Sequence, residues 1–140
     1  MAFQVLVVDD SDIMRSIIRK ILTVSGIDIG TIYEAGNGAE ALAVMEKNWV
    51  DVVLTDINMP TMNGVEMIQK MKTMDGFADV PVIVVSTEGR DNRIEEIMHA
   101  GAVGYITKPF RPEEVAAIVY QALGVNPDER YIEEPEDSDF

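Results

Sequence analysis

The sequence has no cysteine and only one histidine, His99. Without cysteine, neither disulfide bonds nor thiolate metal sites can form. Long apolar runs are missing as well, because the apolar runs have the length of strands and fall short of the ~20 residues that cross a bilayer. The chain also lacks the basic start and long apolar core of a signal peptide. We therefore expect a cytoplasmic protein that does not enter a membrane.

Positive charge is scarce, with 11 Lys and Arg against 25 Asp and Glu and a formal net charge of −14. This balance argues against a nucleic-acid or anionic-lipid partner. Seven of the acidic residues lie within 126–140, beside a single base and two prolines. Such a segment is a poor candidate for packed structure. We predict one folded domain over 1–125 and a disordered acidic tail over 126–140.

Short apolar runs rich in Val and Ile alternate with segments of helical periodicity. Continuous rather than alternating hydrophobicity is typical of strands that are covered on both faces, as in a parallel sheet. The runs are 3–8, 31–35, 50–56, 80–86 and 102–107. Five strands alternating with five helices predict a doubly wound α/β fold with right-handed crossovers.

Five predicted helices lie between and after these runs. The first is marked by Ile13, Ile17, Ile21 and Val24, at spacings of four and three. Apolar residues at such spacings mark the other four: Ala41, Leu42 and Met45; Val65, Ile68 and Met71 or Lys72; Ile94, Ile97 and Met98; Val115, Ile118, Val119 and Ala122. The expected caps are Ser11 or Asp12, Asn37 and Asn63 at the starts, and Gly26, Gly101 and Gly124 at the ends.

Polar residues end or directly follow four of the predicted strands, at the carboxyl ends where doubly wound sheets bind ligands. They are Asp9 and Asp10, Asp56, Ser86 and Thr87, and Thr107, Lys108 and Pro109. Each has an ordinary structural explanation when taken alone: helix-dipole acids, a turn residue, strand-end hydroxyls, a surface lysine. Their joint occurrence favours one shared site.

The stretch VLVVDDSD (5–12) crowds like charges at a strand end, which is unfavourable unless a cation binds there. Carboxylates with water and a backbone carbonyl form a hard oxygen site that suits Mg²⁺. A central Asp carboxylate can attack phosphorus and form an aspartyl phosphate. A lysine and a hydroxyl are the groups that would stabilise the phosphoryl oxygens.

Four motifs resemble the receiver domains of two-component response regulators, of the stand-alone CheY-like kind. They are VDDS (8–11), DINMPTMNG (56–64), VVSTEG (84–89) and GYITKPF (104–110), and the likeness covers about residues 3–124. The resemblance implies a flavodoxin-like sheet of five parallel strands in the order 2-1-3-4-5 with five helices. It implies a phosphorylated protein rather than an enzyme with a separate substrate.

The resemblance also assigns roles to residues. It implies that Asp56 accepts the phosphoryl group and that Mg²⁺ is held by Asp9, Asp10, Asp56 and the backbone carbonyl of Asn58. It further implies that Lys108 contacts the phosphate, that a cis bond precedes Pro109, that Ser86 is the switching hydroxyl and that Tyr105 is the rotating aromatic.

One position departs from the family pattern, because Thr87 stands where a small residue usually follows the switching hydroxyl. This leaves open whether Ser86 or Thr87 makes the contact, and the bulk of Thr87 is expected to hinder a phosphatase. Asn58 and Glu88, two residues after Asp56 and Ser86, favour the chemotaxis branch of the family.

The implied partners are a histidine kinase as phosphodonor, a downstream protein such as a flagellar switch, and a phosphatase. We expect a monomer whose output passes through contacts, since only the acidic tail follows the domain. Phosphorylation is expected to expose a face built around Ile94, Met98, Tyr105 and Val115.

Alternative functions are an intermediate phosphorelay carrier and an interaction module that works without phosphorylation. A haloacid dehalogenase-type phosphatase matches Asp10-Ser11-Asp12 but not Met14. A flavodoxin fits poorly, because the acidic first loop would repel its phosphate.

Overall fold

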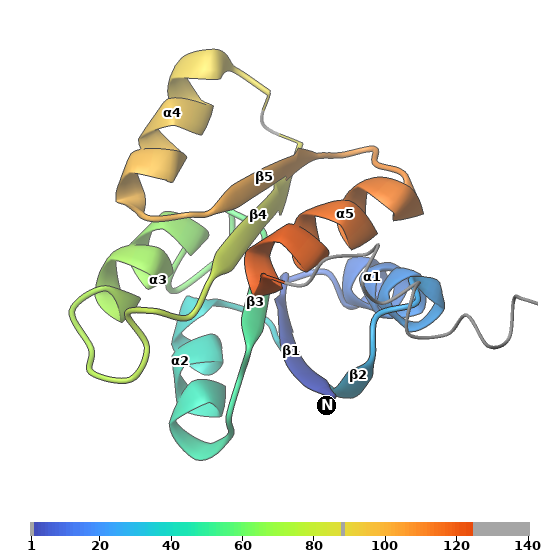
Figure 1. Cartoon of the computed structure of the whole chain (residues 1–140). Coiled ribbons are helices and arrows are strands. Elements are labelled where there is room, and N and C mark those ends of the chain that lie inside the picture. The colour runs from blue at the N-terminus through green and yellow to red at the C-terminus, as the bar shows by residue number, and fades with distance from the viewer. Residues whose placement is uncertain (1, 88, 125–140) are drawn as a thin grey trace, which may run out of the picture.

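A parallel sheet of five strands in the order β2-β1-β3-β4-β5 forms the centre of the fold (Figure 1). The structure, a computed structural model, describes residues 2–87 and 89–124. The predicted tail, the end of the domain and Glu88 lie outside the described residues. The strands are β1 (Phe3–Val8), β2 (Ile29–Ala35), β3 (Val52–Thr55), β4 (Val82–Ser86) and β5 (Gly104–Thr107). The predicted fold class and strand order are confirmed.

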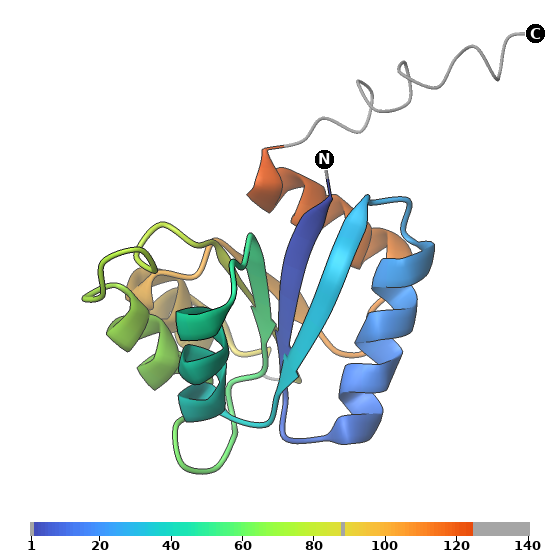
Figure 2. The same cartoon turned by 90° about the horizontal axis from the view of Figure 1, so that it is seen from below.

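Five helices cover the two faces of this sheet: α1 (Asp12–Val24), α2 (Gly38–Lys47), α3 (Gly64–Met71), α4 (Asp91–Ala100) and α5 (Pro112–Leu123). Residues of α1 and α5 pack on one face, and those of α2, α3 and α4 on the other. Figure 2 shows α1 across the sheet from α2 and α3. Within β1, Leu6 and Val8 face the second group while Val5 and Val7 face the first. Burial on both faces explains why β1 is apolar at every position from Val5 to Val8.

Side-chain caps start several helices where the sequence predicts them. The Ser11 hydroxyl accepts a hydrogen bond from the Met14 N–H, so Ser11 rather than Asp12 is the N-cap of α1. Asn37 caps α2, and Asn63 forms a reciprocal capping box with Glu66 at α3. At the other ends, Gly101 and Gly124 are the C-caps of α4 and α5, and Gly26 lies one residue beyond the C-cap of α1.

The apolar stripe that predicts α1 packs on the sheet only in part, through Ile21. Ile13 and Val24 are 71% and 75% exposed, while Ile18 and Leu22 are buried. Because α1 carries apolar residues on two neighbouring stripes, its periodicity indicates a helix without telling which stripe faces inward. The predicted helix is confirmed, and its buried stripe is visible only in the structure.

The predicted strands at 50–56, 80–86 and 102–107 start too early. Val50 and Ala102 are buried but precede β3 and β5, so burial of a connecting segment imitates a strand in the sequence. In β2 the error is reversed, because the strand already begins at Ile29.

Candidate functional site

The carboxyl ends of four adjacent strands bring the predicted site residues to one edge of the sheet. The parallel register pairs Val8 with Thr55 and Ser86 with Thr107, so β1 and β3 end level with each other, as do β4 and β5. Because Thr55 pairs with Val84, β4 and β5 extend slightly further toward this edge. The residues that directly follow these four strands therefore lie at this edge: Asp9, Asp56, Thr87 and Lys108.

Three carboxylates gather there. Asp9, Asp10 and Asp56 each offer an oxygen atom, and these oxygens all lie within 4.8 Å of one another. Asp9 is 2% exposed, Asp56 is half-buried and Asp10 is exposed. The Lys108 Nζ lies 3.3 Å from Oδ2 of Asp9 and 3.4 Å from Oδ2 of Asp56. The site therefore has a buried carboxylate, that of Asp9, and an exposed one, that of Asp10. Lys108 pairs with both Asp9 and Asp56.

Burial raises the pKa of the Asp9 carboxyl, and the nearby Asp56 carboxylate raises it further. The Ser11 N–H, which donates to Oδ1 of Asp9 at 2.9 Å, and the charge of Lys108 act in the opposite direction. A raised pKa means that these contacts do not fully compensate the buried charge. Hard oxygen ligands with uncompensated negative charge fit a divalent cation such as Mg²⁺.

The backbone around Asp56 is fixed by a close approach of α3. A Cβ atom at Gly64 would lie 2.3 Å from the Asp56 carbonyl oxygen, so only glycine fits there. The Gly64 N–H donates to the Ile57 carbonyl at 2.8 Å, and the Ile57 N–H donates to Oδ1 of Asp56 at 2.7 Å. Gly64 thus holds the loop that carries the central carboxylate, a role that the sequence analysis missed.

The predicted switch residues lie beside this pocket in different environments. Ser86 is 1% exposed, its carbonyl accepts the Lys108 N–H at 2.8 Å, and Thr87 is exposed. Tyr105 pairs with Val84 and packs, half-buried, against the core on the α2–α4 face. Asn58 is exposed.

The structure therefore brings Asp9, Asp10, Asp56 and Lys108 into contact range and places Ser86 at the same edge. The Lys108–Pro109 bond is cis, as the family resemblance implies. By contrast, Val115 is 1% exposed and packs against the α1 side of the sheet, so it cannot join the face predicted with Tyr105.

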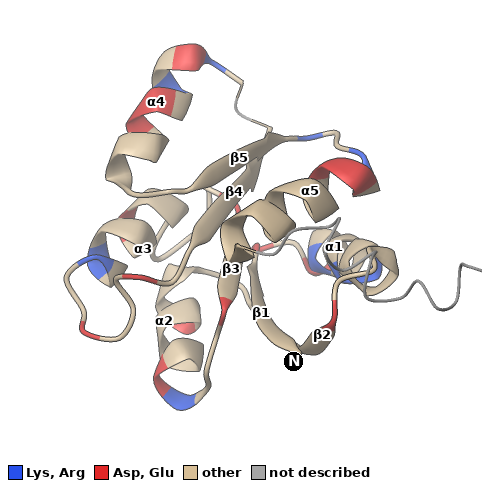
Figure 3. Ribbon diagram, viewed as in Figure 1, with Lys and Arg blue, Asp and Glu red and all other residues tan. Residues whose placement is uncertain are grey.

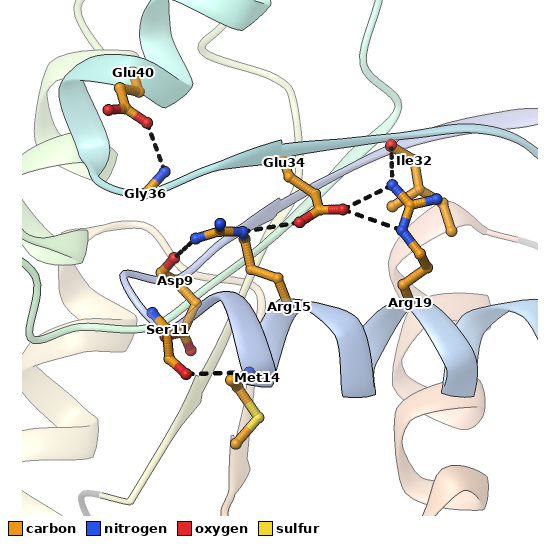
Figure 4. A network of polar contacts seen from close by, with 9 residues as sticks. All are labelled: Asp9, Ser11, Met14, Arg15, Arg19, Ile32, Glu34, Gly36 and Glu40. Carbon is orange, nitrogen blue, oxygen red and sulfur yellow. Dashed lines mark hydrogen bonds and ion pairs between the residues drawn. The ribbon is translucent and has the colours of Figure 1, made fainter.

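A second polar network adjoins the site, and the sequence analysis missed it too (Figure 4). Arg15 on α1 donates to the Asp9 carbonyl and, through Nε, to Oε1 of Glu34 on β2 at 2.9 Å. Arg19 donates to Oε2 of Glu34 and to the Ile32 carbonyl. These two arginines lower the pKa of Glu34. A charge inside the apolar run TIYEA is the signal that could have revealed the network.

The fold and the site together define a doubly wound α/β protein with an acidic pocket at the carboxyl edge of its sheet. Residues 5–120 match the response regulator receiver domain family, and the chain belongs to that family. It is 41% identical over 122 residues to a chemotaxis protein CheY homolog of Campylobacter jejuni, across 86% of this chain and 92% of that protein.

Two further relatives agree with this assignment. The chain is 36% identical over 124 residues to the chemotaxis protein CheY1 of Helicobacter pylori, across 88% of this chain and 98% of that protein. The solved structure of the chemotaxis protein CheY4 of Vibrio cholerae matches with a TM-score of 0.79 and 31% identity, across 88% of this chain and all of that one.

The described helices are short or carry many charges. Within residues 2–87 and 89–124, none has the length and apolar content that a membrane span requires. Basic residues are spread over several elements there, among them α1 and the segment after β5 (Figure 3).

Proposed function

We propose that this protein is a stand-alone response regulator that accepts a phosphoryl group on Asp56 from a histidine kinase. The observation that carries the proposal is the clustering of Asp56 with Asp9 and Asp10 under a lysine that reaches two of the three carboxylates. If these acids served the fold alone, we would expect each to have its own basic partner, because the repulsion between neighbouring carboxylates is unfavourable.

The reaction is a transfer of the phosphoryl group between two nucleophiles. A carboxylate oxygen of Asp56 attacks phosphorus, an O–P bond forms and the P–N bond of the kinase phosphohistidine breaks. The electron pair of that bond stays on the imidazole nitrogen, which then takes a proton. Lys108, 3.4 Å from Asp56, is placed to pair with the charge of the transferred group.

Asp9, Asp10, Asp56 and the backbone carbonyl of Asn58 are the groups that would hold Mg²⁺ in this proposal. The first three offer oxygens within 4.8 Å of one another, which is the donor chemistry that Mg²⁺ prefers. When bound, the ion supplies positive charge that offsets the charge of the phosphoryl oxygens. Through Lys108, which directly follows β5, the protein supplies a second positive charge 3.4 Å from Oδ2 of Asp56.

The test is phosphorylation by acetyl phosphate with Mg²⁺, followed by measurement of the intact mass. We expect one added phosphoryl group on the wild type and none on Asp56→Asn. Asp75→Asn is the control, because Asp75 is an exposed aspartate on the loop after α3. A wild type that gains no mass would support an interaction module that works without phosphorylation.

The phosphorylated site is proposed to act on partners through Ser86 and Tyr105. A phosphoryl oxygen is a strong acceptor for the buried Ser86 hydroxyl, because charge-assisted hydrogen bonds exceed neutral ones. Drawing Ser86 toward Asp56 moves the loop after β4 and makes room for Tyr105, which already packs on the α4 side. Both positions must pre-exist, since phosphorylation can only shift their balance.

This shift changes the surface formed by α4 and β5, where Ile94, Met98 and Tyr105 are large apolar residues that solvent reaches. NMR spectra with and without beryllofluoride test it. Shifts that stay around Asp56 and leave Tyr105 and α4 unchanged would contradict it.

Chemotaxis is the proposed pathway, with a flagellar switch protein as target and a phosphatase that ends the signal. Relatives at 41% and 36% identity are described as chemotaxis proteins, and Asn58 and Glu88 fit that branch. We expect the beryllofluoride form to bind the flagellar switch protein of the same genome more tightly than the free form. Onward transfer to a phosphohistidine domain would instead indicate a relay carrier.

A further inference from the structure

Arg15 connects the acidic pocket to the edge of the sheet. It lies in the first turns of α1 and is only 19% exposed, which is low for an arginine. Its guanidinium donates to the Asp9 carbonyl through Nη1 and to Glu34 through Nε (Figure 4). Two acceptors, one on β2 and one just after β1, fix a planar group in one orientation, because guanidinium donors form a rigid fork.

The Asp9 carbonyl needs such a donor because the sheet ends there. The last hydrogen bond between β1 and β2 runs from the Asp9 N–H to the Ala35 carbonyl at 3.0 Å. Another rung would need an N–H from beyond Gly36, but the chain turns into α2 at Asn37. The Gly36 N–H is occupied as well, because it donates to Oε1 of Glu40 at 2.8 Å. Arg15 therefore supplies a donor where the ladder of the sheet no longer can.

The peptide that Arg15 holds is the one between two predicted Mg²⁺ ligands. Asp9 is also held by the Ser11 N–H and by Lys108 at its carboxylate. Asp10 is exposed, and the direction of its side chain follows from the orientation of that same peptide. Fixing the Asp9 carbonyl thus fixes Asp10 more than Asp9.

We propose that Arg15, anchored by Glu34, is a positioning residue that sets the Asp9–Asp10 peptide for binding of Mg²⁺. The inference rests on the proposed function, because it takes the acidic pocket to be a Mg²⁺ site. Residues that orient metal ligands without touching the metal typically change metal affinity by about 10- to 100-fold when they are lost.

Arg19 offers a matched control. It lies on the same helix, one turn later, and pairs with the same Glu34 carboxylate at 2.8 Å. Its other contact is the Ile32 carbonyl, away from the pocket. Arg15→Met and Arg19→Met each remove one positive charge near Glu34. Charge loss alone would strengthen Mg²⁺ binding in both, so weaker binding has the opposite sign and reports the lost contact.

The experiment is a Mg²⁺ titration of the unphosphorylated full chain, followed by the amide NMR signals of Asp10 and Ser11. We expect about tenfold weaker binding in Arg15→Met, near the lower end of the range for such residues. In Arg19→Met we expect no weakening. With acetyl phosphate, Arg15→Met should need more Mg²⁺ for half-maximal rate and reach nearly the wild-type rate at saturation.

Equal Mg²⁺ affinity in wild type and Arg15→Met would overturn the inference and leave the proposed function standing. A wild type that binds no Mg²⁺ would overturn both. Thermal unfolding in EDTA checks that the variants fold. If Arg15→Met does not fold, Arg15→Lys takes its place, because its single ammonium cannot serve both acceptors and should weaken Mg²⁺ binding by a smaller factor.

Discussion

Two aspartates border the same strand and have opposite surroundings. Asp51 precedes β3, and its two oxygens accept the Gln4 N–H at 2.7 Å and the Trp49 Nε1–H at 2.8 Å. Asp56 follows β3 and stands among two other carboxylates, with Lys108 3.4 Å from Oδ2. Both oxygens of Asp51 are satisfied by hydrogen bonds within the fold, whereas the negative charge of Asp56 and its neighbours is not fully compensated.

The direction of the strands explains the difference. At its amino edge a parallel sheet presents N–H groups, such as that of Gln4, which a carboxylate can accept. At its carboxyl edge the strands end in carbonyls, which offer nothing to an acid. Carboxylates collected at that edge need a cation or a ligand, and this is why they indicate function rather than architecture.

The largest expected effect falls on Asp10→Ala. It removes one of the three clustered carboxylates, and we expect Mg²⁺ binding and phosphorylation to be lost. Asp51→Ala should bind Mg²⁺ as the wild type does, because Asp51 lies at the opposite end of β3. Calorimetric titration measures both. Unchanged Mg²⁺ affinity in Asp10→Ala would remove the basis for the metal site.

Lys108→Ala should have the next largest effect. It leaves the buried Asp9 carboxylate without its ion pair, and breaking a buried pair destabilises a protein by about 3 kcal/mol or more. Because Asp56 is partly exposed, we expect Lys108→Ala to lower the free energy of unfolding in EDTA by roughly 2–3 kcal/mol.

Mg²⁺ should restore more stability to this variant than to the wild type, because the ion replaces the missing charge. Urea denaturation with and without Mg²⁺ measures the difference. The variant should also fail to change its partner affinity after phosphorylation, and normal partner binding would refute the role of Lys108 in signalling.

Asp51→Ala should lower the free energy of unfolding by about 1–2 kcal/mol, because two donors lose a charged acceptor at a half-buried position. Trp49 reports the change directly through its fluorescence. Asp75→Ala is the control and should lie within about 0.5 kcal/mol of the wild type. A comparable loss in the control would show that general charge, not the two hydrogen bonds, is responsible.

The position of each acid at the carboxyl edge could be predicted from the sequence, because it depends only on the residue at which one strand ends. Val8 is followed by Asp9 and Thr55 by Asp56, so finding the strand ends already places both carboxylates at one edge. The alternation of strands and helices predicts the fold class for the same reason. Each of these inferences uses only neighbours in the chain.

The parts that could not be predicted depend on pairings far apart in the chain. Arg15 meets Glu34 only because one stripe of α1 faces β2, and the periodicity of α1 fits two stripes. The need for glycine at position 64 appears only when α3 is placed against Asp56. Positioning residues are therefore harder to find than the ligands they support.

The smallest effect concerns pH and Asp9, the most buried acid of the carboxyl edge. Burial holds its folded-state pKa above the ordinary value of 3.8, so the folded protein binds this proton more tightly than the unfolded chain does. Ionised Asp9 therefore lowers stability at neutral pH, and this penalty disappears as the pH falls through the raised pKa toward 3.8.

Asp9→Asn removes the penalty. In EDTA at pH 7, we expect the free energy of unfolding of Asp9→Asn to be slightly higher than that of the wild type. This gain should be smaller than the loss caused by Asp51→Ala. The free energies of unfolding of Asp9→Asn and the wild type should converge as the pH falls. Urea denaturation across that range measures it, and the Asn side chain can still accept the Ser11 N–H. A variant that is less stable at pH 7 would show that the ion pair with Lys108 outweighs burial, and the carboxyl edge would then resemble the satisfied Asp51 more closely than its charges suggest.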